Sequence, residues 1–417
     1  MGSLKLTKRE KSWILYDVGN SAFTMLVSTL IPIYFNALAE ADGISSIDYL
    51  AYWGYAGSIA TLLVAIIGPV FGTLADRRNF KKPIFIVALV LGAAACALMG
   101  FAWSWLAFLV IFVLAKVCYS SSLVFYDAML PETTTEARMD SVSSQGYAWG
   151  YIGSCIPFIA CLVLVLMHDK LGMSQSTAMC VAFILTAAWW VLLSVPLLKT
   201  YKQDKYVEAH GNPFGQTFSR LWETFKNIRQ EKHIFLFLLA FFFFIDGVYT
   251  IIDMAVAYGT AVGLDTTGLL LALLVTQFVA FPCSIIFGRL AGKFDSGTLI
   301  KVCIIAYTGI TIFAIFLAHQ WQFWVLAVCV GMFQGGVQAL SRSYFGKIIP
   351  PEKSGEYFGL YDICGKGASF MGTTLIAVVT QASNSESIGV AALVVVFIIG
   401  ILLFTKADRA CKAALGK

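Results

Sequence analysis

The stretch VALVLGAAACALMGFAW, residues 87–103, is a continuous apolar run without a charged residue. About twenty such residues suffice to cross the hydrocarbon core of a bilayer as an α-helix. A strand of a membrane barrel would instead alternate apolar and polar residues over about ten positions. The stretch therefore predicts a transmembrane helix.

The whole chain has the composition of a protein that is solvated by lipid. Of its 417 residues, 59% are hydrophobic and 13% are charged, whereas about a quarter of the residues in a soluble domain are charged. Because backbone groups in lipid must be satisfied within the chain, we predict an all-α polytopic membrane protein. Twelve stretches are expected to span the membrane: 12–39, 50–75, 82–102, 104–130, 144–168, 174–198, 233–258, 266–292, 298–318, 321–346, 356–382 and 387–405.

The distribution of lysine and arginine predicts the orientation. One set of alternate loops contains basic clusters, such as residues 5–11 and 77–82, whereas the opposite set contains only Lys170. By the positive-inside rule, both termini and the central connection 199–232 are expected in the cytoplasm. This connection contains SRLWETFKNIRQ, residues 219–230, whose pattern predicts an amphipathic helix along the membrane surface.

The chain repeats two landmarks at a nearly constant offset. GTLADRRNFKK (72–82) and GRLAGKFD (288–295) follow the second and eighth spans, while LPETTTEARMD (130–140) and IPPEKSGEYFG (349–359) follow the fourth and tenth. Two halves of six spans in the same orientation predict a parallel repeat with a ligand site between the halves. The expected units are an N-terminal six-helix bundle (1–198), a cytoplasmic linker (199–232) and a C-terminal six-helix bundle with a short tail (233–417).

The loop at residues 72–82 fits the pattern G-x-L-A-D-R-x-x-x-K-K and resembles the signature loop of the major facilitator superfamily. Other stretches are similar to the autophagy-related vacuolar effluxer-like family and its bacterial relatives: WILYDVGNSAF (13–23), YDAMLPE (126–132), QGYAWGYIG (145–153), IDGVYTI (245–251), ALSRSYFGKIIP (339–350) and EYFGLYDICGK (356–366). The resemblance implies the major facilitator fold and a location in a bacterial inner (plasma) membrane. The eukaryotic branch of this family is associated with exporting amino acids from the vacuole.

The resemblance also implies a role for Asp76. In the superfamily, this carboxylate meets a helix N-terminus and links the halves on the cytoplasmic side. Gly292 stands at the matching place of the second copy, so we expect the lock to be one-sided, and Asn79 stands where the loop usually has glycine. Arg77, Lys81 and Lys82 are expected to add ion pairs or lipid phosphate contacts; the alternative of ordinary cytoplasmic loop cations fits Lys81 and Lys82.

The stretch FFFFIDGVYTIID, residues 241–253, places two carboxylates in an apolar span. Asp246 and Asp253 lie seven residues apart and, with Tyr249 and Thr250, are expected on one helix face. A charge near the bilayer centre costs about 3 kcal/mol, so this face must meet protein or water. Either it lines a functional polar cavity, or it makes packing ion pairs and Asp253 reaches the outer interface.

Two lysines also lie deep within spans. Lys116 has no carboxylate one turn away, so its partner is expected on another helix or on the ligand. Lys366 and Asp362 have the spacing of an intrahelical pair, with a substrate or coupling contact as the alternative. We expect the substrate or coupling residues among Asp246, Asp253, Lys116, Asn20, Tyr119, Tyr249, Gln334, Gln338, Asp362 and Lys366. We expect the cytoplasmic gate among Asp17, Asp76, Arg77, Asp127 and Arg342.

These features favour a secondary transporter that works by alternating access. The expected solute is small and polar or zwitterionic, an amino acid being favoured, and shielded carboxylates suggest proton coupling. One alternative is an exporter of amphipathic drugs or lysolipids, and a remote one is a non-transporting membrane sensor. No Walker loop, metal-ligand cluster or nucleophile elbow occurs in the sequence. We therefore predict no enzyme, no cofactor, no metal and no nucleic acid, and a monomer in contact with membrane lipid.

Overall fold

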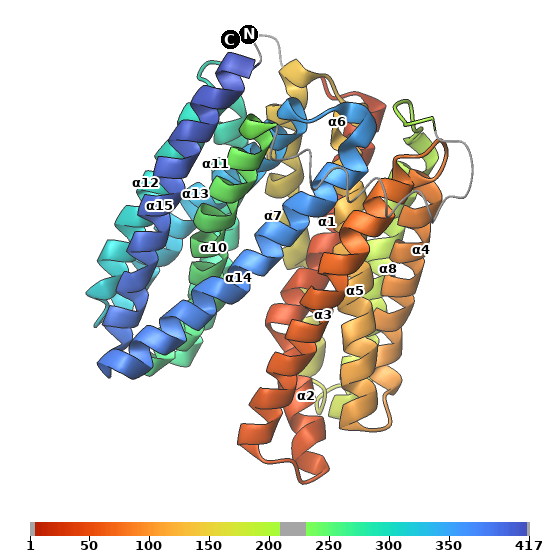
Figure 1. The fold of residues 1–417 in the computed structure, drawn as a ribbon. Helices are drawn as coiled ribbons and strands as arrows, with labels where there is room; N and C mark the ends of the chain where they lie inside the picture. The colour runs from red at the N-terminus through yellow and green to blue at the C-terminus, as the bar shows by residue number, and fades with distance from the viewer. Residues whose placement is uncertain (1–4, 209–230, 415–417) are drawn as a thin grey trace.

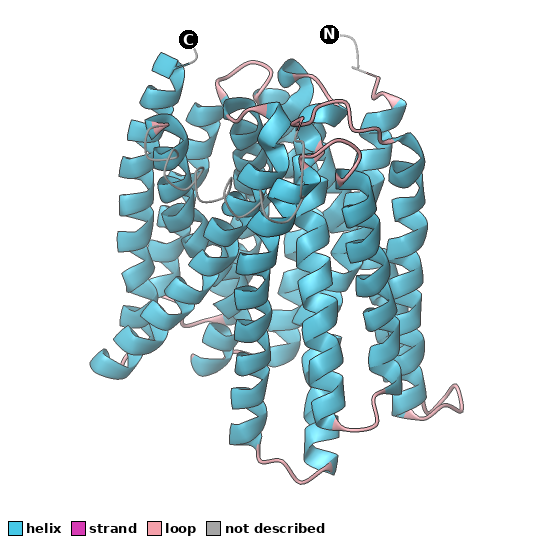
Figure 2. Ribbon diagram, turned by 45° about the vertical axis from the view of Figure 1, so that its right-hand side comes forward, coloured by secondary structure: helices cyan, strands magenta, loops and turns pink. Residues whose placement is uncertain are grey.

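The structure is a computed structural model that describes residues 5–208 and 231–414. The predicted amphipathic stretch 219–230 lies outside the described residues. Within them, 12 helices are long and apolar enough to cross a membrane, which confirms the predicted number of spans. Figure 2 shows loops that connect helices at both ends of the molecule.

The helices fall into two groups along the chain (Figure 1). The first bundle contains α1 (Lys8–Ser28), α2 (Leu30–Ala41), α3 (Ser46–Ala75), α4 (Lys81–Leu98), α5 (Trp105–Ala128), α6 (Leu130–Thr133), α7 (Glu136–Leu166) and α8 (Gln175–Thr200), with a 3₁₀ turn at Met99–Phe101. The second bundle contains α10 (Lys232–Ala261), α11 (Thr266–Leu290), α12 (Ser296–Ile315), α13 (Gln320–Ile348), α14 (Ser354–Ser383) and α15 (Glu386–Ala414), with a 3₁₀ turn at Pro351–Lys353.

Each bundle has its own apolar core. One large cluster of buried side chains is drawn from residues 13–201, and it includes Trp13, Phe108 and Trp190. The other is drawn from residues 234–411 and also takes in Ala128 of α5. Because lipid offers helices no hydrophobic driving force for association, close packing of such side chains holds each bundle together.

Two irregular positions follow from local sequence. The first span is divided at Thr29, between α1 and α2, because Pro32 has no N–H to donate to the carbonyl four residues earlier. Asn79 has a φ of 64°, which is the left-handed conformation that glycine adopts most easily. Asparagine tolerates this conformation better than most residues, so the departure from glycine keeps the turn of the loop.

Both termini lie at the same end of the bundles (Figure 1), which we call the terminal face. The two bundles are in contact through α3 with α14, α5 with α14, and α7 with α11 and α13. Toward the opposite face, the ends of α3 and α14 lie apart (Figure 1). The contact between α3 and α14 is therefore confined to the part of the molecule near the terminal face.

Candidate functional site: a terminal gate and a central cavity

Helices α3 and α14 meet backbone to backbone near the terminal face. A Cβ added to Gly72 would lie 2.3 Å from the carbonyl oxygen of Gly355, and one added to Gly355 would lie 2.4 Å from that of Gly72. One turn further along, a Cβ on Gly359 would lie 2.9 Å from the carbonyl oxygen of Gly68. Pairs of glycines four residues apart on both helices thus allow this approach.

Asp76 follows α3 directly and caps α14 of the opposite bundle. Its Oδ1 accepts a hydrogen bond from the Gly355 N–H at 2.7 Å, and its Oδ2 accepts one from the Glu356 N–H at 2.9 Å. A carboxylate here satisfies donors that lack intrahelical partners and meets the positive end of the helix dipole. Burial raises the pKa of Asp76 to about 7, although Lys81 and the two N–H groups favour its ionised form.

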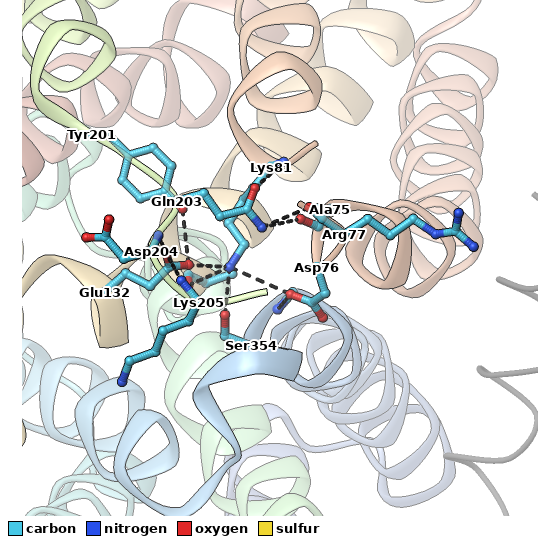
Figure 3. A network of polar contacts seen from close by, with 12 residues as sticks. Ala75, Asp76, Arg77, Lys81, Glu132, Tyr201, Gln203, Asp204, Lys205 and Ser354 are labelled. Carbon is cyan, nitrogen blue, oxygen red and sulfur yellow. Dashed lines mark hydrogen bonds and ion pairs between the residues drawn. The ribbon is translucent and has the colours of Figure 1, made fainter. Parts of the chain in front are cut away.

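Lys81 connects Asp76 to a second carboxylate (Figure 3). Its Nζ donates to Glu132 Oε1 at 2.6 Å and to Ser354 Oγ of α14 at 2.8 Å, and it lies 3.6 Å from Asp76 Oδ1. Lys81 is fully buried, so of its two expected roles the structure shows the ion pair and not the ordinary loop cation. Arg77, which was expected in the gate, is also buried, and its carbonyl oxygen accepts a hydrogen bond from Gln203.

Arg342 of α13 inserts into the first bundle. Its guanidinium donates to Asp127 Oδ1 at 3.0 Å and approaches Asp17 Oδ2 at 3.4 Å, and it also bonds the hydroxyl and the carbonyl oxygen of Ser143. Its Cζ atom lies 4.6 Å from the Trp13 ring centroid and 4.3 Å from that of Tyr147. One buried cation from the second bundle therefore compensates two carboxylates of the first bundle.

Asp140 of α7 makes a further contact between the bundles that sequence reasoning missed. It accepts hydrogen bonds from Ser343 at 2.6 Å and Ser296 at 2.8 Å, and it forms an ion pair with Lys347. On this side the second bundle has Gly292 in place of a carboxylate. The lock built on the Asp76 carboxylate has no matching carboxylate at Gly292, and Asp140 of the first bundle makes a separate contact between the bundles.

A cavity of about 250 Å³ lies between the bundles, beyond these contacts. Helices α1, α3, α5, α10 and α14 contribute the side chains that line it: Phe23, Thr24, Val27, Ser28, Ala60, Thr61, Lys116, Tyr119, Ser120, Tyr249, Asp253 and Lys366. The Tyr119 and Thr24 hydroxyls are 2.6 Å apart. The cavity combines charged groups, hydroxyls and aromatic rings, which is the lining expected for a small polar organic ligand.

The two deep lysines both face this cavity. Lys366 Nζ lies 2.5 Å from Asp362 Oδ1, so the predicted intrahelical pair is present. Lys116 Nζ lies 5.8 Å from the Phe112 ring centroid. Lys116 has no ion pair with a carboxylate of residues 5–208 or 231–414. The charge of Lys116 is therefore not compensated by a side chain within ion-pair distance in these ranges.

Asp246 does not line the cavity, although Tyr249 and Asp253 of the same helix do. It is fully buried, and its Oδ1 accepts hydrogen bonds from the Gly372 N–H of α14 at 2.8 Å and from Thr250 at 3.4 Å. Of the two alternatives for this helix face, the polar cavity does not extend to Asp246, because α14 covers the face of α10 there. Asp246 Oδ2 has no hydrogen-bond partner among the described residues.

The remaining candidates are the amides Asn20, Gln334 and Gln338. Asn20 Nδ2 is 3.5 Å from Asp17 Oδ1, and Gln338 Oε1 accepts a hydrogen bond from Tyr151 of α7 at 3.3 Å. Gln334 lines a second, mostly apolar cavity inside the second bundle. These amides therefore serve contacts of the gate and of the second bundle, and they do not line the central cavity.

Two helical bundles around a central cavity are the arrangement of a membrane transporter fold. The fold is similar to that of a variant of the E. coli fucose:proton symporter FucP, with a TM-score of 0.73 and 15% sequence identity, covering 96% of this chain and 97% of that chain. The chain thus has the fold of the major facilitator superfamily of transporters.

The family follows from the sequence comparisons. Residues 7–414 match the family described as "Vacuole effluxer Atg22 like", and the chain belongs to this family. It is 42% identical to an uncharacterised MFS-type transporter, YxiO of Bacillus subtilis, over 96% of this chain and 94% of that protein. It is 22% identical to autophagy-related protein 22 of Kluyveromyces lactis, over 90% of this chain and 88% of that protein. The chain is therefore a transporter of the MFS type.

Proposed function

We propose that this transporter moves a small zwitterionic solute, with an amino acid favoured, by alternating access. The observation that carries the proposal is the cavity between the bundles, where Lys116 of the first bundle and Asp253 of the second line one space. A solute with a carboxylate and an ammonium group can form charge-assisted hydrogen bonds with both side chains. Such binding would link the two bundles across the cavity.

The charges in the cavity favour a carboxylate at Lys116. Lys366 is compensated by Asp362 within α14. Lys116 lacks a comparable ion pair among the described residues, and a cation away from bulk water is stabilised by an anionic partner. The hydroxyls of Tyr119 and Thr24 offer additional hydrogen bonds on the same side.

The closed terminal face supports a proposal for the conformational state. The basic loops favour a cytoplasmic location for this face, and the gate contacts of Asp76, Arg342 and Asp140 hold it shut. The structure is then the outward-facing state. Transport requires these contacts to break while the bundles approach each other at the opposite face.

Proton coupling is the second part of the proposal. Asp246 is fully buried, and one of its oxygens has no partner among the described residues, so a proton there would remove the cost of the charge. Asp17 and Asp127 offer a second location, because gate opening would withdraw Arg342 from two carboxylates at once. A proton could then replace the lost positive charge.

The test is uptake by the purified protein in proteoliposomes, with radiolabelled amino acids supplied singly under an imposed pH gradient. We expect uptake of at least one amino acid, a large loss of it in Lys116→Gln, and no loss in Lys170→Gln, whose side chain is exposed in a loop. Asp246→Asn should transport without responding to the pH gradient. Equal uptake by Lys116→Gln and the unmodified protein would remove Lys116 from the site.

One observation favours an amphipathic solute as the second candidate. The cavity inside the second bundle, about 100 Å³ in volume, is lined mainly by apolar side chains such as Ile310, Leu326 and Val330. It could receive the apolar part of a larger solute. Thermal-shift screening of amino acids against lysolipids and lipophilic cations separates the two candidates.

A further inference from the structure

We propose that Glu132 is a positioning residue of the terminal gate and that residues 201–207, which begin the connection between the bundles, hold it in place. We call residues 201–207 the strap. This inference rests on the proposed alternating-access function, since it concerns how the closed gate is stabilised. It assigns the connection a role beyond joining the bundles.

Among the described residues, the strap supplies three of the four hydrogen bonds to the Glu132 carboxylate (Figure 3). The Tyr201 hydroxyl donates to Oε1 at 3.1 Å, and the Asp204 and Lys205 N–H groups donate to Oε2 at 2.8 and 3.3 Å. The fourth donor is Lys81. Because a buried carboxylate needs its lone pairs satisfied, these donors fix its position.

The strap is also bound to the loop that contains Asp76. The Gln203 side chain donates to the carbonyl oxygens of Ala75 and Arg77, both at 3.0 Å, and accepts from the Lys81 N–H at 3.3 Å. The Val207 N–H donates to the Asp76 carbonyl oxygen at 2.8 Å. The strap therefore fixes both carboxylates that face Lys81.

The second bundle enters this network at the start of α14. Lys81 reaches Ser354, and Asp76 reaches the next two N–H groups of the same helix. A lysine side chain has a flexible four-carbon stem, and its shortest contact, with Glu132 at 2.6 Å, helps to hold its ammonium near Ser354. The order of support runs from the strap to Glu132, then to Lys81 and finally to α14.

This order has a mechanical consequence. The contacts of the strap named above are all with residues of the first bundle, so releasing the strap leaves the α3–α14 glycine contact intact at first. Releasing the strap weakens the polar contacts of Lys81 and Asp76 with α14 and thereby favours opening of the terminal face. Neither bundle needs to unfold for this to happen.

The experiment measures amide hydrogen exchange of Gly355 and Glu356, whose N–H groups are free only when the gate opens. The variants are Tyr201→Phe and Gln203→Ala, with Lys202→Ala as the matched control because Lys202 is an exposed strap residue. Each lost hydrogen bond should speed exchange by about 2- to 13-fold, and Lys202→Ala should leave it unchanged. The measurement needs no solute, so its outcome is independent of whether transport is observed.

A double-mutant cycle separates positioning from general stability. If the strap acts through Glu132 and Lys81, Tyr201→Phe, which removes the hydrogen bond to Glu132, should add little to the exchange rate in a Lys81→Met background. A full additional effect there, or unchanged exchange in both strap variants, would overturn the proposal. Protection of the α15 amides from exchange shows whether each variant is folded. If Gln203→Ala loses this protection, the result of Tyr201→Phe, which removes only one hydroxyl, is used to judge the proposal.

Discussion

Replacement of Gly72 by alanine tests how the terminal gate closes. The added Cβ would lie 2.3 Å from the carbonyl oxygen of Gly355, and ordinary contacts begin at 3.4 Å, so α3 and α14 must separate by about 1 Å. Both contacting groups are backbone, and no side-chain rotation relieves the overlap. Separation by this distance also lengthens the hydrogen bonds from α14 to Asp76.

The cost can be expressed as a change in the gate equilibrium. Overpacking a well-packed contact typically costs about 1–3 kcal/mol. The open state of the gate does not contain this contact, so the cost falls on the closed state. The open population should therefore rise by about 5- to 150-fold.

Amide exchange of Gly355 and Glu356 reports this population in detergent or nanodiscs. The matched control is Gly54→Ala on the same helix, where an added Cβ meets nothing within 4 Å. We expect faster exchange in Gly72→Ala and no change in Gly54→Ala. Exchange that is equally slow in both variants would refute the reasoning, because α3 and α14 could then not be in backbone contact.

Three further outcomes are expected. Burial raises the pKa of Asp76 from 3.8 to about 7 in the closed gate, and exposure on opening should restore the ordinary value. Closure of the gate therefore takes up a proton. The closed state should gain stability as pH falls from about 7 toward 4 and lose it as pH rises through 7. Spin-label distances across the terminal face measure this dependence, which should be absent in Asp76→Asn. Arg342→Met leaves two buried carboxylates without their cation and should destabilise the closed form by about 3–5 kcal/mol. Adding Asp127→Asn should restore part of the lost melting temperature. If the double variant melts no higher than Arg342→Met, the shared ion pair is contradicted. Lys116→Gln removes a charge-assisted hydrogen bond of about 1.5–3 kcal/mol and should raise KM for the transported solute by about 10- to 150-fold without changing the melting temperature.

The sequence was most informative where the physics is local. Long apolar runs predicted the twelve spans, because length and hydropathy alone decide whether a helix can cross a bilayer. The signature loop indicated that Asp76 meets a helix N-terminus, and the structure places it at the start of α14. Arg342, Asp17 and Asp127 were grouped as gate residues, and the structure brings them together.

Contacts between distant loops were not predictable in the same way. Glu132, Asp140 and the strap are polar residues near helix ends, where polar residues are ordinary, and no periodic pattern distinguishes them. Only the fold brings Glu132 within reach of Lys81, 51 positions away, and Asp140 within reach of Lys347, 207 positions away. Helix periodicity also could not show that α14 covers Asp246 while leaving Asp253 at the cavity.

The central claim is that a solute in the cavity between the bundles is reached from one face at a time. Spin-label distances test it directly with one pair on the terminal face, at Arg78 and Glu352, and one on the opposite face, at Tyr55 and Ala382, all of which are exposed. On adding the transported solute, we predict that the terminal pair moves apart while the opposite pair moves together. Two distances that stay fixed, or that change in the same direction, would contradict alternating access.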